Sequence, residues 1–241
     1  MKTAFHIKAV CAVLLIGSAL PAVAQQAVGR PALDPSLEGT RVSSSKDAAE
    51  ELARYARCVV AQRYDRVRAM VLAPYGSKEQ IEAADKVTQG LGDSCLKGGF
   101  DLIELRVRPD YLAGSAAQAM VLAEYPDLPA VIQSIAFDDA AERERAVQLG
   151  ATERFGRCLV RRDSAAVQAL LSAAPASDQE RQAVSALKED MGWCLAEGST
   201  LRITQMFLRN VTAVAAYRLA QEVSPRSRKR ASAARAGARN A

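Results

Sequence analysis

Apolar residues recur at helical spacing from Asp47 onward. Leu52, Tyr55 and Val59 lie at positions i, i+3 and i+7, and charged residues occupy positions between them. This period predicts an amphipathic helix with one buried face. The pattern returns later in the chain, where an apolar stripe contains Val147, Ala151, Phe155 and Leu159. The sequence therefore predicts two matching helices, with Tyr55 and Phe155 in the core.

Both helices are followed by the same series of local signals. A short apolar segment (67–73 or 167–173) ends at a turn that contains Pro74 or Pro175. A serine then opens the next helix, and a side chain with an amide or carboxylate follows three positions later. The two pairs are Ser77 with Gln80 and Ser177 with Glu180. This spacing predicts a capping box, in which the paired side chains satisfy free amides at a helix N-terminus.

Two cysteines occupy matching places in the two segments. The run Tyr55-Ala56-Arg57-Cys58 corresponds to Phe155-Gly156-Arg157-Cys158, and Cys95-Leu96 corresponds to Cys194-Leu195. At a constant offset of 99 residues the identical pairs are Leu96/Leu195, Gly99/Gly198, Leu102/Leu201, Ala116/Ala215, Ala117/Ala216 and Pro126/Pro225. The agreement predicts an internal duplication.

The cysteines that follow the first 24 residues number four, and four cysteines allow three disulfide connectivities. The duplication favours Cys58–Cys95 together with Cys158–Cys194, because a unit that once existed alone paired within itself. Closing a loop of about 37 residues stabilises the fold by roughly 3–4 kcal/mol. The alternative is four free, buried thiols.

The fold expected from these patterns is all-α. We expect two tandem homologous units of about four helices each, at 47–126 and 142–225, and each unit contains one internal disulfide. A connector at 127–141 has no counterpart in the duplication. Its apolar residues Val131, Ile132 and Ile135 indicate that it packs against the body. Each unit is small, so its hydrophobic core is limited, and the disulfide compensates by stabilising the fold.

The N-terminal region has the pattern of an export signal. Lys2 and Lys8 form a positively charged segment before an apolar run at 9–19, and Ala22-Val23-Ala24 offers a cleavage site. We therefore expect a signal peptide at 1–24, a flexible leader at 25–46, and an exported protein that is periplasmic or secreted. No later stretch is apolar enough to predict a transmembrane segment.

The C-terminal region at 226–241 is rich in cations and has no acidic residue. The cations are Arg226, Arg228, Lys229, Arg230, Arg235 and Arg239. We expect a disordered tail that makes weak contact with an anionic surface, or that serves only to keep the protein soluble. The whole chain has 32 basic and 27 acidic residues, but eight cations lie in the signal and the tail. The remaining body is slightly acidic, which argues against a specific nucleic-acid-binding surface.

Catalytic motifs are missing from the sequence. The single histidine, His6, lies in the expected signal peptide. This excludes Ser-His-Asp and Cys-His catalysis and the common histidine-ligated metal or haem sites from the mature chain. The sequence predicts no cofactor, no metal site and no catalytic residue, and the protein is expected not to be an enzyme.

Three sets of residues invite a functional interpretation. Acidic pairs such as Glu50-Glu51 are expected on solvated helix faces, and only a cleft that gathers carboxylates would favour a glycoside hydrolase. Trp193 is expected to pack in the core rather than to form a ligand platform. Arg57 and Arg157 precede matching cysteines, and both are expected to face solvent.

The chain contains a recognisable module. It consists of the Arg-Cys helix, the serine-capped helix that ends in Cys-Leu, and the alanine-rich closing helix. With these features it resembles uncharacterised exported bacterial proteins that share a duplicated helical two-cysteine module. The resemblance covers 47–225 and implies the fold and compartment, but no activity. Such relatives start the closing helix with Leu-Arg-Gly, whereas this chain has Leu112-Ala113-Gly114 and Val211-Thr212-Ala213.

The function expected from the sequence is a non-enzymatic role. We expect an exported helical protein that binds another protein of the cell envelope, at the surface between the two units. The first alternative is a carrier with an apolar cavity for a small ligand. The second alternative is a hydrolase that uses only carboxylates.

Overall fold

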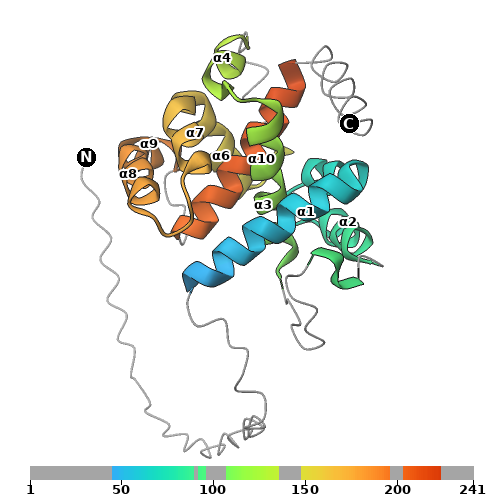
Figure 1. Cartoon of the computed structure of the whole chain (residues 1–241). Helices are drawn as coiled ribbons and strands as arrows, with labels where there is room; N and C mark the ends of the chain where they lie inside the picture. Colours follow the sequence, from blue (N-terminus) through green and yellow to red (C-terminus); the bar gives the residue numbers. More distant parts are fainter. Residues whose placement is uncertain (1–44, 90–91, 96–106, 136–147, 196–202, 224–241) are drawn as a thin grey trace, which may run out of the picture. The chain divides into compact units, whose positions relative to one another are not determined.

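The computed structural model describes residues 45–89, 92–95, 107–135, 148–195 and 203–223. These residues form nine α-helices and one 3-10 helix, and there is no strand among them (Figure 1). The α-helices are α1 (Ser45–Leu72), α2 (Lys78–Thr88), α3 (Pro109–Glu124), α4 (Leu128–Gln133), α6 (Ala151–Arg162), α7 (Ser164–Ser172), α8 (Asp178–Ala186), α9 (Lys188–Cys194) and α10 (Gln205–Val223). The 3-10 helix is η2 (Gly92–Cys95). The prediction of an all-α fold is confirmed for this part of the chain.

The first helix is longer than the sequence pattern indicated. The apolar segment at 67–73 continues α1 after a kink at Arg63, where φ is −136° and ψ is 39°. The later segment breaks at the corresponding place. There α6 ends, Asp163 takes φ −141° and ψ 77°, and its side chain caps α7 by accepting a hydrogen bond from the Ala166 amide at 2.8 Å.

Both predicted serine caps are present, but the return hydrogen bond of each predicted capping box is made to the residue before the cap. Ser77 Oγ accepts a hydrogen bond from the Gln80 amide at 3.1 Å, and Gln80 Oε1 accepts one from the Gly76 amide at 2.8 Å. Gly76 has φ +72°, a left-handed conformation that glycine adopts without steric cost. The second turn repeats these contacts among Ala176, Ser177 and Glu180. Ala176 also has a positive φ, at 58°.

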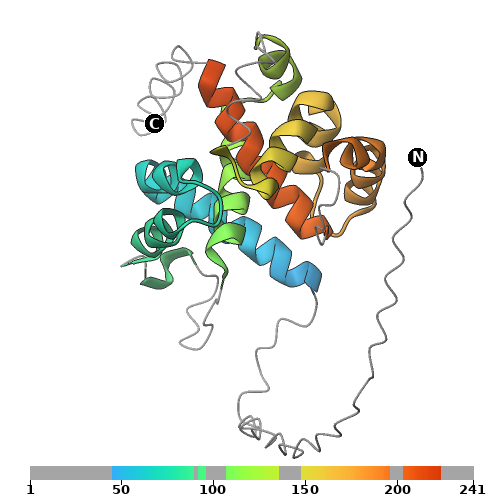
Figure 2. The same cartoon turned by 180° about the vertical axis from the view of Figure 1, so that it is seen from behind.

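Two helices from distant parts of the chain cross at the centre of the core. Figures 1 and 2 show α3 and α10 side by side, with α1 and α2 to one side and α6 to α9 to the other. The crossing is close, because a Cβ atom added at Gly114 would lie 2.3 Å from the Cβ of Asn210. Alanines line the buried faces of both helices at Ala113, Ala116, Ala117, Ala213, Ala215, Ala216 and Ala220. Small side chains therefore set the spacing of the central pair.

Each of the two favoured disulfides is present. Cys58 on α1 is bonded to Cys95 in η2, with the Cα atoms 5.5 Å apart. Cys158 on α6 is bonded to Cys194 on α9, with the Cα atoms 5.6 Å apart. Each bond attaches a short helix to the helix that packs on the central pair.

The segment after α3 packs on the body, as its apolar residues predicted. Leu128 and Ile132 on α4 are buried. The side-chain amide of Gln168 on α7 binds the N-terminal end of α4 through both its oxygen and its nitrogen. Its Oε1 accepts a hydrogen bond from the Leu128 amide at 3.0 Å, and its Nε2 donates one to the Pro126 carbonyl at 2.6 Å.

The prediction that Trp193 packs in the core is wrong. Tyr55 and Phe155 are buried as predicted, but Trp193 is 70% exposed. It lies on α9, a short helix with no buried residue, and the guanidinium of Arg162 covers one face of its ring at 5.5 Å. The disulfide at Cys194 fixes this helix, so the neighbouring indole need not be buried.

The described ranges contain no helix that is both long and apolar enough to cross a membrane. The expected signal peptide, the tail and most of the leader lie outside the described residues. The six cations of the tail are among the residues outside the described ranges.

Candidate functional site

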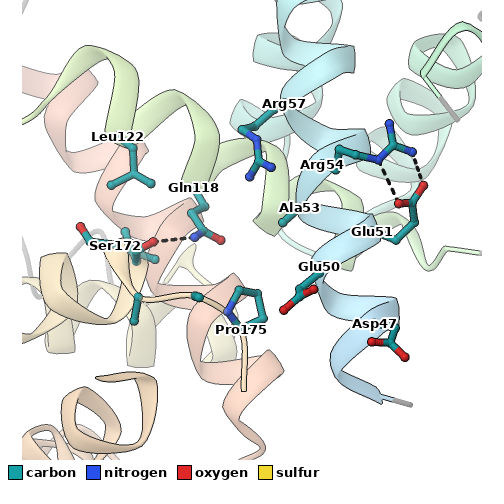
Figure 3. Close-up of a pocket in the computed structure, with 13 residues that line it drawn as sticks. Asp47, Glu50, Glu51, Ala53, Arg54, Arg57, Gln118, Leu122, Ser172 and Pro175 are labelled. Atoms are coloured by element: carbon teal, nitrogen blue, oxygen red, sulfur yellow. Dashed lines mark hydrogen bonds and ion pairs between the residues drawn. The ribbon is translucent and has the colours of Figure 1, made fainter. Parts of the chain in front are cut away.

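A pocket of about 560 Å³ lies between α1, α3 and the end of α7. Its volume falls within the range of typical ligand sites, about 300–1,000 Å³. Figure 3 shows α1 along one side and the turn after α7 along the other. The lining residues are Asp47, Glu50, Glu51, Ala53, Arg54, Arg57, Gln118, Leu122, Leu171, Ser172, Ala173, Ala174 and Pro175.

Acidic side chains form the rim near the start of α1. Asp47 and Glu50 are exposed, and Glu50 forms an ion pair with Lys46 at 3.7 Å. Glu51 is held by Arg54, whose Nε donates a hydrogen bond to it at 2.9 Å (Figure 3). Hydrogen bonding to Glu51 raises the pKa of Arg54. The rim is therefore lined by acidic side chains and open to water, and two of its three carboxylates are paired with cations.

Arg57 is the cation of this pocket that has no partner among the described residues. It is exposed and has no hydrogen bond or ion pair within the described part of the chain. Figure 3 shows its guanidinium projecting from α1 into the space next to the helix that carries Gln118. An arginine in this position offers a planar set of donors that matches a carboxylate.

Backbone carbonyls form the opposite wall, at the C-terminal end of α7. Leu171 O accepts hydrogen bonds from Gln118 Nε2 at 2.5 Å and from Arg209 Nη1 at 3.4 Å. Ala173 O accepts no hydrogen bond from any residue that the structure describes. The C-terminal end of a helix carries partial negative charge and attracts cations. Among the described residues of this wall, the carbonyls of Leu171 and Ala174 are therefore engaged, and that of Ala173 is not.

A charged group lies at the C-terminal end of α1. Its members are Glu153, Arg157, Arg218 and Glu222. Arg218 of α10 donates from Nε to Val71 O at 2.9 Å and from Nη2 to Ala73 O. Its Nη1 forms an ion pair with Glu153 of α6, and the two side chains are only 10% and 12% exposed. Burial lowers the pKa of Arg218, while the charge of Glu153 opposes this effect.

A second ion pair lies in the same group, and it corrects the prediction for Arg157. Arg157 is buried, and it donates to both carboxylate oxygens of Glu222 at 2.7 and 3.3 Å. Arg57 is exposed, as predicted. The local sequence around both arginines is alike, but the partner Glu222 lies 65 residues further along the chain. Local sequence therefore contains no sign that the two arginines differ.

The residues of the pocket can be compared with the charged group at a constant offset in the sequence. At an offset of 100 residues, Ala53 and Arg57 of α1 stand opposite Glu153 and Arg157 of α6. At the same offset, Gln118 and Leu122, which line the pocket, stand opposite Arg218 and Glu222. Gln118 donates to Leu171 O, as Arg218 donates to Val71 O. Of the four charged residues, only the arginine that precedes the cysteine recurs beside the pocket.

The site offers charged and polar groups that can recognise a ligand. Among the described residues, no three metal-ligating side chains are placed so that they could hold a metal ion. The pocket was not predicted from the sequence, whose signal for it is the loss of charge at Ala53, Gln118 and Leu122, at an offset of 100 from Glu153, Arg218 and Glu222. The predicted anionic-surface contacts in the tail lie outside the described residues and are not brought to this site.

Comparison of the chain with protein-family models, with curated proteins and with solved structures found no match.

Proposed function

We propose that this protein is an exported, non-enzymatic helical module, and that the pocket between α1, α3 and α7 is where it binds a partner of the cell envelope. The observation that carries the proposal is the state of Arg57. It projects into a pocket of about 560 Å³ without a partner among the described residues. Its counterpart Arg157 is paired with Glu222. An unpaired guanidinium beside open space is a binding group for an external carboxylate.

The proposal includes a duplicated architecture of two tandem homologous units. Four local features support it. The helix breaks fall at Arg63 and Asp163, and the residues with a positive φ are Gly76 and Ala176. Both serine caps and both disulfides also lie at corresponding positions. The pocket then lies between the units, because α1 and α3 belong to the first and α7 to the second.

Export to an oxidising compartment is part of the same proposal. Two disulfides in a chain of this size are typical of periplasmic and secreted proteins. The signal-like pattern at 1–24 supports the same compartment. A partner in the envelope is therefore within reach of the pocket.

A carboxylate hydrolase is the second candidate, and the acidic rim favours it. Asp47, Glu50 and Glu51 all line the pocket. The geometry supports binding better, because a catalytic acid is normally held in an apolar site that disfavours its ionised form. Asp47 and Glu50 are exposed, and Glu51 is paired with Arg54. If the protein cleaves an envelope polysaccharide and Glu50→Gln abolishes the cleavage, this candidate replaces the binding module.

An apolar-ligand carrier receives less support from the same pocket. Its lining includes charged groups from α1 and polar backbone groups from α7. Small apolar ligands are bound in sites that are lined mainly by hydrophobic side chains. The pocket is therefore better suited to a charged partner.

Site-specific photo-crosslinking in cells tests the binding proposal. A photoreactive residue replaces Leu122, which lines the pocket and is 40% exposed, or Ile81 of α2, which is 45% exposed and does not line it. We expect one defined protein adduct from the Leu122 position and none from the Ile81 position. Adding Arg57→Ala should remove the adduct. Equal adducts at both positions, or none at either, contradict the proposal.

A chain truncated after Ser224 separates the pocket from the basic tail in the same assay. If the truncated protein gives the same adduct at the Leu122 position, the pocket holds the partner. If only the full chain gives an adduct and high salt abolishes it, the tail is the functional element, since salt screens attachment through surface charges.

A further inference from the structure

We propose that the exposed indole of Trp193 is a sugar-binding platform, on which a β-linked chain of pyranose rings stacks. This site is separate from the pocket of the proposed function, because neither Trp193 nor its neighbours Arg162 and Asp190 line that pocket. It lies on α9, and α1 and α2 lie on the other side of the central pair of helices (Figures 1 and 2). The exposure of the ring, its fixed orientation and the polar groups beside it carry the proposal.

The indole of Trp193 is open to solvent. The residue is 70% exposed. A Cβ atom added at the preceding Gly192 would meet nothing within 4 Å, so the surface next to the ring is uncovered as well. An indole left in water forgoes the stabilisation that burial of a large aromatic side chain provides. Tryptophan at the surface is among the residues that contribute most to binding contacts.

A comparison within the chain indicates that the fold does not require an aromatic ring at this place. At the offset of 99 that relates the second cysteines of the two segments, Trp193 stands opposite Ser94. At an offset of 100, Arg162 stands opposite Gln62. Ser94 donates a hydrogen bond to Gln62 Oε1 at 3.4 Å, whereas Arg162 covers the ring of Trp193. A small polar pair therefore suffices beside the first disulfide, and the tryptophan beside the second is available for another role.

The ring is held in one orientation by contacts with α6. Cys194, the next residue along the chain, is bonded to Cys158 of that helix. The guanidinium of Arg162 lies over one face of the indole, 5.5 Å from the ring centroid. Arg162 is itself anchored, because its Nε donates a hydrogen bond to Asp190 at 2.6 Å. A ring that is fixed before binding loses less conformational entropy when a ligand stacks on it.

Polar groups beside the ring can bind hydroxyl groups. The two terminal nitrogens of Arg162 donate to no acceptor within the described part of the chain, and Asp190 accepts at only one of its oxygens there. Their side chains are 45% and 19% exposed. A donor and an acceptor next to an aromatic face match a pyranose ring, which has C–H groups on its faces and hydroxyl groups around its edge.

The size of the apolar surface favours a sugar over a protein as the ligand. A stable protein interface covers about 800 Å² on each partner, whereas one aromatic side chain provides about 150–250 Å². Among the described residues, the other large exposed apolar side chains are on α1, α2 and α3, at Leu72, Ile81 and Leu122. Trp193 is therefore an isolated ring with polar neighbours, and a single pyranose ring is large enough to cover it. A β-linked chain of glucose-type rings, whose substituents are equatorial, presents such a face on every ring.

Fluorescence of Trp193 reports binding directly, because it is the single tryptophan of the chain. The full, disulfide-bonded protein is titrated with cellotetraose and with the β-linked tetramer of N-acetylglucosamine, which differ in the acetamido group. Mannitol is the control, since it has hydroxyl groups but no ring. We expect at least one tetramer to bind with a dissociation constant of about 1 mM or lower, to shift the emission to shorter wavelength and to protect the indole from acrylamide. Comparison of the tetramers shows whether the acetamido group is required.

Variants locate the binding by calorimetric titration, which does not depend on the tryptophan signal. Trp193→Ala should weaken binding of the tetramer by at least about tenfold, because it removes the stacking surface. Arg162→Gln introduces the side chain found at position 62 and should weaken binding by about threefold or more. Leu122→Ala is the matched control, since Leu122 is an exposed apolar residue on a different helix. It should leave the affinity unchanged, and far-UV circular dichroism checks that all three variants are folded.

The opposite results overturn the inference. These are no response to either tetramer at about ten times the expected dissociation constant, an equal response to mannitol, or an affinity that Trp193→Ala leaves unchanged. Vesicles of phosphatidylethanolamine and phosphatidylglycerol are tested in parallel, because tryptophan also favours the membrane interface. An emission shift with the vesicles and with neither tetramer assigns the ring to a membrane surface, and the sugar-binding inference is then wrong.

Discussion

The crossing of α3 and α10 gives a quantitative prediction for Gly114→Ala. A Cβ atom at this position would lie 2.3 Å from Asn210 Cβ and 2.6 Å from Asn210 Cα. Carbon atoms in favourable contact lie about 3.5–4.0 Å apart. A backbone atom is among the close neighbours, so rotation of the Asn210 side chain does not relieve the clash. The two helices must therefore move apart by more than about 1 Å.

The expected change in the free energy of unfolding for Gly114→Ala is the sum of two opposing contributions. Replacing glycine by alanine within a helix stabilises it by up to about 1 kcal/mol. Overpacking a close helix contact typically costs about 1–3 kcal/mol, and the cost is largest when the backbone has to move. Because the separation also loosens the alanine contacts along the pair, we expect a net loss of about 2 kcal/mol in the free energy of unfolding.

Two other glycines serve as graded controls. A Cβ at Gly156 would lie 2.8 Å from Val211 O and 3.0 Å from Val211 Cγ2, so Gly156→Ala should cost less, about 1 kcal/mol. A Cβ at Gly192 on α9 would meet nothing within 4 Å. Gly192→Ala should therefore stabilise the protein by up to about 1 kcal/mol.

Urea unfolding of the oxidised protein, followed by far-UV circular dichroism, measures all three variants under one condition. The expected order of stability is Gly192→Ala, the original protein, Gly156→Ala and then Gly114→Ala. If Gly114→Ala is as stable as the original protein, the close crossing of α3 and α10 is refuted. If Gly192→Ala is the least stable variant, the premise that the free space around each glycine determines the stability of its alanine variant is refuted as well.

Three further predictions concern single side chains. Arg157→Ala should lower the free energy of unfolding by about 1–3 kcal/mol, because it removes both hydrogen bonds to Glu222, whereas Arg57→Ala should change it by less than about 0.5 kcal/mol. Urea titration of both variants checks this, and equal losses would contradict it. Ser177→Ala should cost about 1 kcal/mol through loss of the helix cap, to be measured by thermal melting, and no change would argue against the cap. Fluorescence of Trp193, the single tryptophan, should be quenched by acrylamide almost as strongly in the native as in the unfolded protein, since it is 70% exposed. Strong native protection would contradict that exposure.

Features that depend on local sequence were predictable. The helical period around Tyr55 and Phe155 places both residues in the core, where they are buried. Ser77 and Ser177 cap their helices by accepting a hydrogen bond from the backbone amide three positions later, as their place before each helix predicts. The disulfide pairing was also predictable, since the duplicated spacing favours one of the three connectivities.

Features that depend on contacts between distant segments were not predictable in the same way. Arg57 and Arg157 have similar neighbours in sequence, yet Arg157 is buried, because Glu222 reaches it from α10. Trp193 is apolar in character but exposed, because a disulfide rather than a buried face fixes α9. The pocket depends on the meeting of α1, α3 and α7, which no local pattern specifies.

The central claim is that the pocket beside Arg57 binds a partner of the cell envelope. Photo-crosslinking from the Leu122 position, with Ile81 as the matched control outside the pocket, tests this claim most directly. The account predicts one defined adduct from the Leu122 position, which Arg57→Ala removes. Equal adducts at both positions, or none at either, would contradict the account.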